Sequence, residues 1–110
     1  MDAERENLSS ANRVVLKLGT NVVMQSDRSP ALERLTALVQ EIRELRDQGK
    51  EVILVSSGAV GIGAGVIGLG SVPSKLVDRQ ACAAAGQGAL VALFCRLLEG
   101  VNLKGAQVLL

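Results

Sequence analysis

Residues 51–58 read Glu-Val-Ile-Leu-Val-Ser-Ser-Gly, in which four consecutive apolar residues are followed by two serines and a glycine. A short apolar run rich in β-branched residues predicts a strand, and its unbroken apolar character predicts burial on both faces of a sheet. Ligands of parallel sheets bind beyond the carboxyl ends of the strands. Residues 56–58 are therefore a first place to look for a site.

The residues before this strand predict a helix and another strand. Residues 13–18, Arg-Val-Val-Leu-Lys-Leu, form a second apolar run that Gly19 ends. A polar loop follows over residues 21–29, and Ser29-Pro30 predicts a helix N-cap with proline at the first helical position. Apolar residues then recur at three- and four-residue spacing, which predicts an amphipathic helix that Gly49 ends; they are Leu32, Leu35, Leu38, Val39, Ile42 and Leu45.

The residues after this strand predict a second helix and a third strand. A glycine-dense segment over residues 58–70 leads to Pro73-Ser74, which opens a helix that runs to about Glu99 and stops at Gly100. Residues 106–110 predict the third strand. The order strand–helix–strand–helix–strand predicts an α/β fold, with a parallel sheet and helices on both of its faces. Residues 1–12 are expected to be a polar tail before one domain over residues 13–110.

Composition excludes several classes of function. The chain has 110 residues, 48% of them hydrophobic, with a net charge of +1 and no histidine. The near-neutral charge argues against a nucleic-acid partner and against an anionic membrane surface. The lack of histidine excludes Ser-His-Asp and Cys-His catalysis and histidine-ligated zinc. Lysine, carboxylates, hydroxyls, backbone amides or a cofactor must therefore carry any chemistry.

Location and redox state are also predicted from the sequence. Residues 1–11 lack the apolar core of a secretory signal, and the longest uncharged stretches, residues 52–74 and 80–95, fall short of about 20 continuous apolar residues. Cys82 and Cys95 lie 13 residues apart in the predicted helix, so about 20 Å separates them along its axis and they cannot pair. These features predict a soluble cytoplasmic protein with two buried thiols.

Lys17 is unusual because it interrupts an apolar strand one residue before the strand ends. A cation at this end of a parallel sheet suits an anionic ligand, and Gly19-Thr20 would let backbone amides approach that ligand closely. The alternative is an edge strand whose Val15 and Lys17 simply meet solvent, with an ordinary turn after it.

Ser57 and Gly58 repeat this arrangement after the second strand. Small hydroxyl residues and glycine at the start of a helix suit the binding of a carboxylate or a phosphate. The alternative is a serine that only caps the helix.

Two further patterns favour packing over chemistry. Gly63-Ala-Gly65-Val-Ile-Gly68 matches the G-x-G-x-x-G dinucleotide fingerprint, but it begins seven residues after Ser56 instead of at the strand-to-helix turn. The small residues of segment 80–94 predict close helix packing or a subunit contact.

Taken together, these motifs resemble the glutamate kinases of the amino acid kinase family. The resemblance runs through Val14-Val-Leu-Lys-Leu-Gly-Thr-Asn-Val-Val23, Gly49-Lys-Glu-Val-Ile-Leu-Val-Ser-Ser-Gly-Ala-Val60 and Gln80-Ala-Cys-Ala-Ala-Ala-Gly-Gln87, and on to residues 106–110. Family members that act on other substrates carry Gly-Gly after the strand lysine, where this chain has Gly19-Thr20.

The resemblance implies a reaction and a role for each candidate residue. Lys17 would be catalytic through its contact with the transferred phosphate of ATP, and Gly19 and Thr20 would line the ATP side of the cleft. Ser57 and Gly58 would bind L-glutamate. Mg²⁺ would be held mainly through the nucleotide, with no protein metal site. The product would be γ-glutamyl phosphate, on the route to proline, and the full-length form would be a homo-oligomer.

Glutamate needs no general base for this reaction, since its γ-carboxylate is already ionised at neutral pH. The chain differs from the family in its length. Family members continue beyond the third strand, and that continuation carries most of the ATP pocket. We therefore expect an incomplete α/β/α sandwich, the N-terminal portion of a glutamate kinase or of a bifunctional pyrroline-5-carboxylate synthase. A non-catalytic interaction module and a Rossmann-like dinucleotide-binding module stay open as alternatives.

Overall fold

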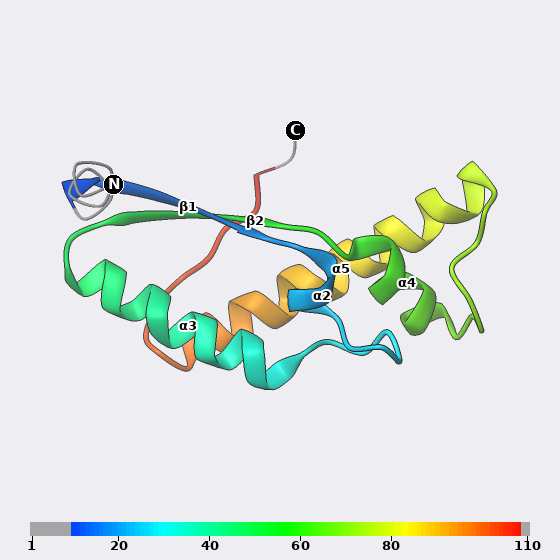
Figure 1. Cartoon of the computed structure of the whole chain (residues 1–110), viewed down its shortest axis with the longest axis horizontal. Helices are drawn as coiled ribbons and strands as arrows, with labels where there is room; N and C mark the ends of the chain where they lie inside the picture. The colour runs from blue at the N-terminus through cyan, green and yellow to red at the C-terminus, as the bar shows by residue number, and fades with distance from the viewer. Residues whose placement is uncertain (1–9, 109–110) are drawn as a thin grey trace, which may run out of the picture.

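The computed structural model describes residues 10–108 as two strands and four helices (Figure 1). The elements follow in the order β1 (Arg13–Leu18), α2 (Thr20–Val23), α3 (Leu32–Asp47), β2 (Glu51–Ser56), α4 (Ala59–Ile67) and α5 (Leu76–Glu99). Most of the predicted tail, residues 1–9, lies outside the described residues. The last two residues of this tail, Ala11 and Asn12, are hydrogen-bonded at the start of β2. The Glu51 amide donates to the carbonyl of Asn12, and Lys50 Nζ donates to that of Ala11.

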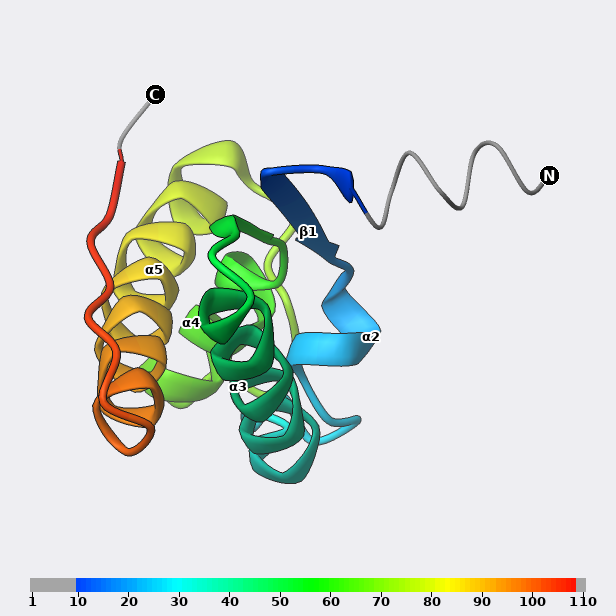
Figure 2. The ribbon, with the colours of Figure 1, turned by 90° about the vertical axis from the view of Figure 1, so that its left-hand side faces the viewer.

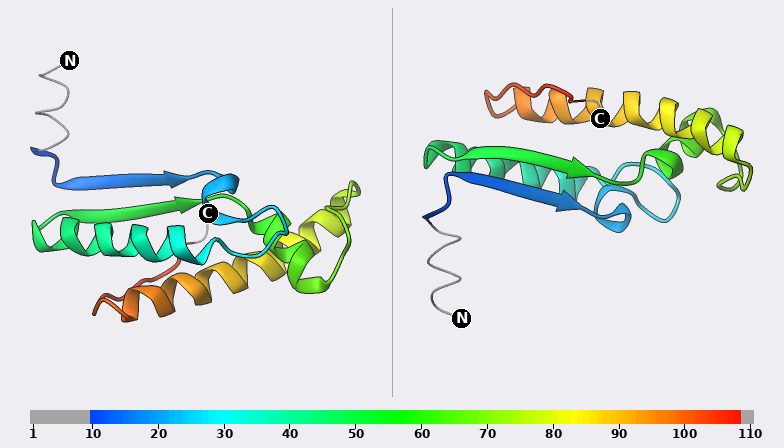
Figure 3. Two further views of the ribbon diagram at one scale, coloured as in Figure 1. Left: turned by 60° about the horizontal axis from the view of Figure 1, so that its bottom comes forward. Right: turned by 90° about the horizontal axis from the view of Figure 1, so that it is seen from above.

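β1 and β2 are parallel, with Arg13 opposite Glu51 and Leu18 opposite Ser56. Alternate residues of both strands face the helices, and the others face away. Helices α3 and α5 lie along one face of this pair, and α2 and α4 lie beyond the carboxyl ends of the strands (Figures 1 and 3). The expected burial of β2 on both faces is therefore wrong for the described residues, since Ile53 is 46% exposed and Val55 is 47% exposed. The expected α/β class with a parallel sheet is confirmed, but among residues 10–108 helices cover only one face of the strand pair instead of both.

The core lies between the covered face of the sheet and helices α3, α4 and α5. It is built from aliphatic side chains and the single aromatic residue, all of them buried: Leu18, Val23, Leu35, Ile62, Leu90, Leu93 and Phe94. Leu35 comes from the apolar stripe that predicted α3, and Leu54 of β2 packs against the cluster from the sheet. The predicted amphipathic helix is confirmed, and its apolar side packs against the covered face of the sheet.

Both ends of α3 have a clear local cause. The expected N-cap at Ser29 is wrong, because residues 24 and 30 pair in an isolated antiparallel bridge and the helix begins at Leu32, after Ala31. At the other end, Gly49 has φ +80°, and its amide donates to the carbonyl of Arg46 at 2.9 Å. This left-handed position favours glycine, so the predicted stop at Gly49 is confirmed.

The glycine-dense segment forms helix α4, which packs closely on α5 (Figure 2). A Cβ built at Gly63 would overlap the carbonyl of Cys82, and one at Gly86 would overlap the carbonyl of Ala59. The predicted close packing of small residues is therefore confirmed. The structure does not support a dinucleotide-binding motif here, since Gly63 and Gly65 lie inside a helix and not at a strand-to-helix turn.

Helix α5 is the longest element, with 24 residues. By length and composition alone, it is the one helix among residues 10–108 long and apolar enough to cross a membrane. Its Leu90, Leu93 and Phe94 lie buried in the core described above. Core helices with such a face pass the same test of length and composition.

The two cysteines of α5 are both free thiols. Cys82 is buried, as expected, but Cys95 is only half-buried, and its thiol contacts the exposed Gly105. The expectation of two buried thiols is therefore right for one of them.

The expected third strand is not formed over residues 104–108, and residues 109–110 lie outside the described part. The start of this segment lies beside α5, where the Cys95 thiol donates to the carbonyl of Gly105 at 3.8 Å (Figure 2). A strand exists only where its backbone groups pair with those of a neighbour. Residues 104–108 are exposed, and they have no strand assignment because their backbone makes no such pairing.

Candidate functional site

The turns that follow β1 and β2 lie side by side at the carboxyl end of the sheet. The amide of Ser57, the first residue after β2, donates to the carbonyl of Leu18, the last residue of β1, at 2.9 Å. The Cα of Thr20 lies 3.9 Å from the position that a Cβ would take on Gly58. The structure therefore brings together Gly19-Thr20 and Ser57-Gly58, as parallel pairing predicts.

Gly58 turns the chain sharply from β2 into α4. It has φ +98° and is the N-cap residue of that helix, with its carbonyl accepting from the amide of Ile62 at 2.9 Å. No side chain caps α4, so the alternative role of Ser57 as a helix cap is wrong. The first-turn amides of a helix have no carbonyl partner inside it, and here they begin beside the exposed Ser57.

Lys17 lies opposite Val55 on the open face of the sheet, and its side chain is exposed. It stands one residue before the carboxyl end of β1, on the face opposite to that of Leu18. This place suits a cation that reaches over the strand end toward an anion, and it equally suits an edge lysine. The catalytic role of Lys17 stays a prediction.

Gly19 and Thr20 form the start of the short helix α2. Gly19 has φ −74°, its carbonyl accepts from the amides of Val22 and Val23, and a Cβ built on it would meet nothing within 4 Å. This glycine is therefore not required by its own backbone or by the described neighbours. Open space beside it leaves room for a ligand to approach the main chain.

Arg34 of α3 is a residue of this region that sequence reasoning missed. Its guanidinium donates to three main-chain carbonyls at the end of α2, those of Asn21 at 3.0 Å, Val22 at 3.2 Å and Met24 at 3.4 Å. In the sequence it is one of many charges on the polar side of an amphipathic helix. Nothing in that pattern distinguishes it from its neighbours.

The loop after α2 is held by polar contacts. The hydroxyl and amide of Ser29 donate to Asp27 Oδ1 at 2.5 and 3.0 Å, and these hydrogen bonds hold the pKa of the Asp27 carboxyl below its ordinary value. Arg28 has φ +67°, and its Nη2 donates to the carbonyl of Leu69 at 3.1 Å. The loop is thereby tied to the connection between α4 and α5.

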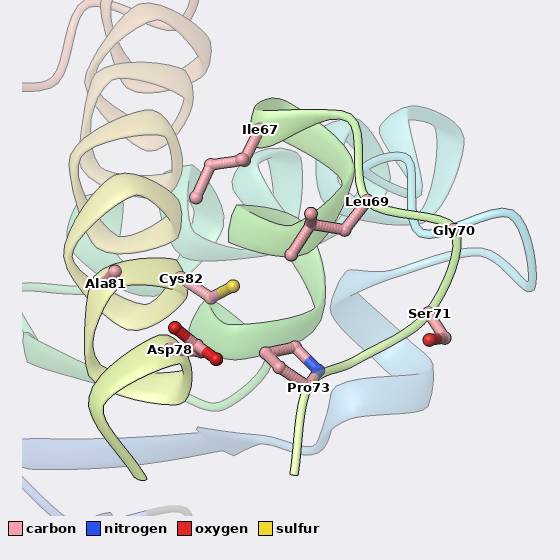
Figure 4. Close-up of a pocket in the computed structure, with 8 residues that line it drawn as sticks. All are labelled: Ile67, Leu69, Gly70, Ser71, Pro73, Asp78, Ala81 and Cys82. Atoms are coloured by element: carbon pink, nitrogen blue, oxygen red, sulfur yellow. The ribbon is translucent and has the colours of Figure 1, made fainter. Parts of the chain in front are cut away.

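Two open cavities flank this end of the molecule. The larger, of about 460 Å³, lies between the end of α4 and the start of α5 (Figure 4). The lining of this cavity is mostly apolar and includes none of the predicted site residues. The lining residues are Ile67, Leu69, Gly70, Ser71, Pro73, Asp78, Ala81 and Cys82. The second, of about 410 Å³, borders α2 and the loop after it. Within residues 10–108 no group of three His, Cys, Asp or Glu side chains is placed to hold a metal ion.

The sequence is similar to kinases over almost its whole length. Glutamate 5-kinase of Symbiobacterium thermophilum is 42% identical over 106 residues, which are 96% of this chain and 40% of that protein. Glutamate 5-kinase of Methanococcoides burtonii is 36% identical over 110 residues, all of this chain and 29% of that protein. Delta-1-pyrroline-5-carboxylate synthase of Solanum lycopersicum is 38% identical over 119 residues, 99% of this chain and 17% of that protein.

The chain thus spans two-fifths or less of the length of these relatives, and it corresponds to the N-terminal part of the glutamate 5-kinases. The model of the amino acid kinase family matches residues 12–110, which include both strands and all four helices. This match extends from the residue before β1 to the last residue of the sequence, and the chain therefore belongs to the amino acid kinase family.

Proposed function

We propose that this chain supplies one wall of a glutamate 5-kinase site, where the γ-phosphoryl group of ATP is transferred to the γ-carboxylate of L-glutamate. The observation that carries the proposal is the contact between the two turns, residues 19–20 and 57–58, at the carboxyl end of a parallel strand pair. The glutamate 5-kinases at 42% and 36% identity support this choice of substrate.

The chemistry of this transfer suits the residues present. Glutamate attacks as a carboxylate that is ionised at neutral pH, so that a chain without histidine lacks nothing for the nucleophile. What remains is to bring two anions together and to stabilise the charge on the moving phosphoryl group. A lysine, helix-end amides and the Mg²⁺ that accompanies ATP are groups able to do this.

Each turn takes one substrate in this proposal. Lys17 reaches the transferred phosphate from the open face of β1, and Gly19-Thr20 lets the nucleotide phosphates approach the main chain. Ser57 and the first turn of α4 after Gly58 hold the glutamate. In this proposal, residues beyond the aligned part supply the remainder of the ATP pocket, since the chain spans 40% and 29% of the two glutamate 5-kinases.

A chimera tests the proposal. Residues 12–110 replace the corresponding segment of the Symbiobacterium thermophilum glutamate 5-kinase, and ADP release is measured with ATP and Mg²⁺, with and without glutamate. We expect glutamate-dependent release from the chimera. A folded chimera, checked by circular dichroism, that releases no ADP with glutamate would contradict the proposal and favour a non-catalytic role.

The match to the Solanum lycopersicum delta-1-pyrroline-5-carboxylate synthase favours a second parent. In this form of the proposal the parent is a bifunctional enzyme with the same kinase chemistry. The same replacement in that synthase distinguishes the two parents. A segment from a bifunctional enzyme should support higher turnover there than in the bacterial kinase.

A further inference from the structure

We propose that Arg34 is the positioning residue of the site: its guanidinium holds helix α2 in place and so keeps Gly19-Thr20 against Ser57-Gly58. The positioning role rests on the proposed function, because it matters to the reaction only if these turns bind substrates. The clamp itself rests on the hydrogen bonds of one side chain and can be tested without any activity.

Helix α2 cannot hold its own shape. It has four residues, no side chain caps it, and a single turn of helix is unstable alone. Four carbonyls therefore need partners at its end, and the structure supplies all of them. Those of Asn21 and Val22 accept from Arg34, that of Thr20 accepts from the amide of Met24 at 2.9 Å, and that of Val23 accepts from the amide of Ala31 at 2.8 Å.

Arg34 is suited to this task by its chemistry and its place. It lies in the first turn of α3, and Ala31 is the N-cap residue of that helix, so the start of one helix supplies the donors for three of the four carbonyls. A guanidinium presents several N–H groups in a fixed plane, whereas a lysine ammonium is a single point of charge. Within residues 10–108 Arg34 makes no ion pair, so the main chain of α2 and Met24 is its bonded target.

The clamp reaches the site through Val23, the last residue of α2. Its side chain is completely buried, and its Cγ1 lies 3.6 Å from where a Cβ on Gly58 would stand. Holding α2 therefore seats Val23 beside Gly58 and, at the other end of the same turn, fixes Thr20 next to that glycine. Release of α2 would separate the two turns without unfolding the sheet.

Amide hydrogen exchange of the 110-residue chain tests the clamp directly. The reporters are the amides of Val22, Val23 and Met24, which close α2. In Arg34→Met these amides should exchange about tenfold faster or more, since hydrogen bonds from a charged donor are lost. Arg34→Lys should give a smaller increase, because an ammonium can satisfy only part of the set.

Arg43 provides a matched control on the same helix. It also donates to a main-chain carbonyl, that of Val101 at 3.2 Å, and it pairs with Asp47, but it lies at the far end of α3. Arg43→Met should leave the exchange of the α2 amides unchanged. The proposal is overturned if these amides exchange at the intrinsic rate in the unsubstituted chain. It is equally overturned if both Arg34 variants speed exchange throughout the chain, because Arg34 is then a general stabiliser.

Kinetics in the chimera test the consequence for the reaction. Arg34→Met should raise the KM for ATP about tenfold and that for glutamate less, because α2 carries the turn assigned to ATP. Arg43→Met should change neither. Equal KM values in Arg34→Met and the unsubstituted chimera would overturn the positioning role. A chimera without activity would count against the proposed function alone, since the exchange experiment still decides the clamp.

Discussion

At the scale of single residues, a substitution of Lys17 can change activity without changing stability, because the side chain is exposed. Lys17→Met in the chimera should lower kcat for glutamate-dependent ADP release by about 10³ or more, as expected when a cation on a transferring phosphoryl group is lost. The free energy of unfolding should change by less than about 0.5 kcal/mol. Lys104→Met, at another exposed lysine, is the control. Near-normal turnover in Lys17→Met would leave the lysine with the role of protecting a sheet edge.

Gly58 has a conformational requirement that its neighbours lack. With φ +98° it occupies a region that a β-branched residue rarely adopts, while the space around a Cβ is ordinary. Gly58→Val should therefore lower the free energy of unfolding by about 2 kcal/mol, and Gly58→Ala by about 1 kcal/mol. Urea denaturation measures both. Gly19→Ala, at φ −74° with open space, is the control and should be near neutral.

Ser57 is free of a capping role, so its loss should affect only binding. Ser57→Ala in the chimera should raise the KM for glutamate more than the KM for ATP. The free energy of unfolding of Ser57→Ala, measured by thermal denaturation, should stay within about 0.5 kcal/mol of that of the unsubstituted protein. A loss of stability with both KM values unchanged would return Ser57 to a structural role.

At the scale of elements, the contact of α4 with α5 depends on two glycines. A methyl group on Gly63 or on Gly86 would overlap the main chain of the other helix, whereas one on Gly88 would meet nothing within 4 Å. Gly63→Ala and Gly86→Ala should each destabilise by about 2 kcal/mol or more in urea denaturation. Gly88→Ala should stabilise by about 0.5–1 kcal/mol through helix propensity. A neutral Gly86→Ala would show that the helices can move apart at no cost.

The elements that the sequence predicted well are those with a signal of their own. Leu35, Val39 and Ile42 repeat at helical spacing, and Gly49 ends the helix by its backbone freedom, so α3 follows from local chemistry. The third strand and the cap at Ser29 depend instead on partners. Residues 106–108 lack a strand to pair with, and the bridge between Met24 and Pro30 displaces the expected helix start.

At the scale of the whole molecule, the sheet has an uncovered apolar face. Val15 is 59% exposed, and Ile53 and Val55 are about half exposed beside it. The 110-residue chain alone should therefore associate, and light scattering should give a mass above 11.5 kDa. Ile53→Thr with Val55→Thr should reduce this association and keep strand propensity. A monomer with both residues unchanged would contradict the expectation.

The site as a whole was predictable in part. Two turns after two parallel strands must meet at one edge, which is why residues 19–20 and 57–58 could be placed together before the structure was known. The clamp by Arg34 could not, because its three acceptors are main-chain carbonyls and carry no side-chain signature. Every residue has a main-chain carbonyl, so the residue types at positions 21, 22 and 24 do not reveal that they accept hydrogen bonds from Arg34.

Parallel pairing also sets an order of events on the ribosome. Arg13 pairs with Glu51, 38 residues later, and a ribosome that adds about 5–20 residues each second takes about 2–8 s to supply that partner. Helix α3 can form and melt on a microsecond timescale once it is released, whereas the apolar strand β1 stays unpaired until residues 51–56 are made. Arg13 and Lys17 place positive charge at both ends of that strand and would discourage neighbouring nascent chains from pairing with it.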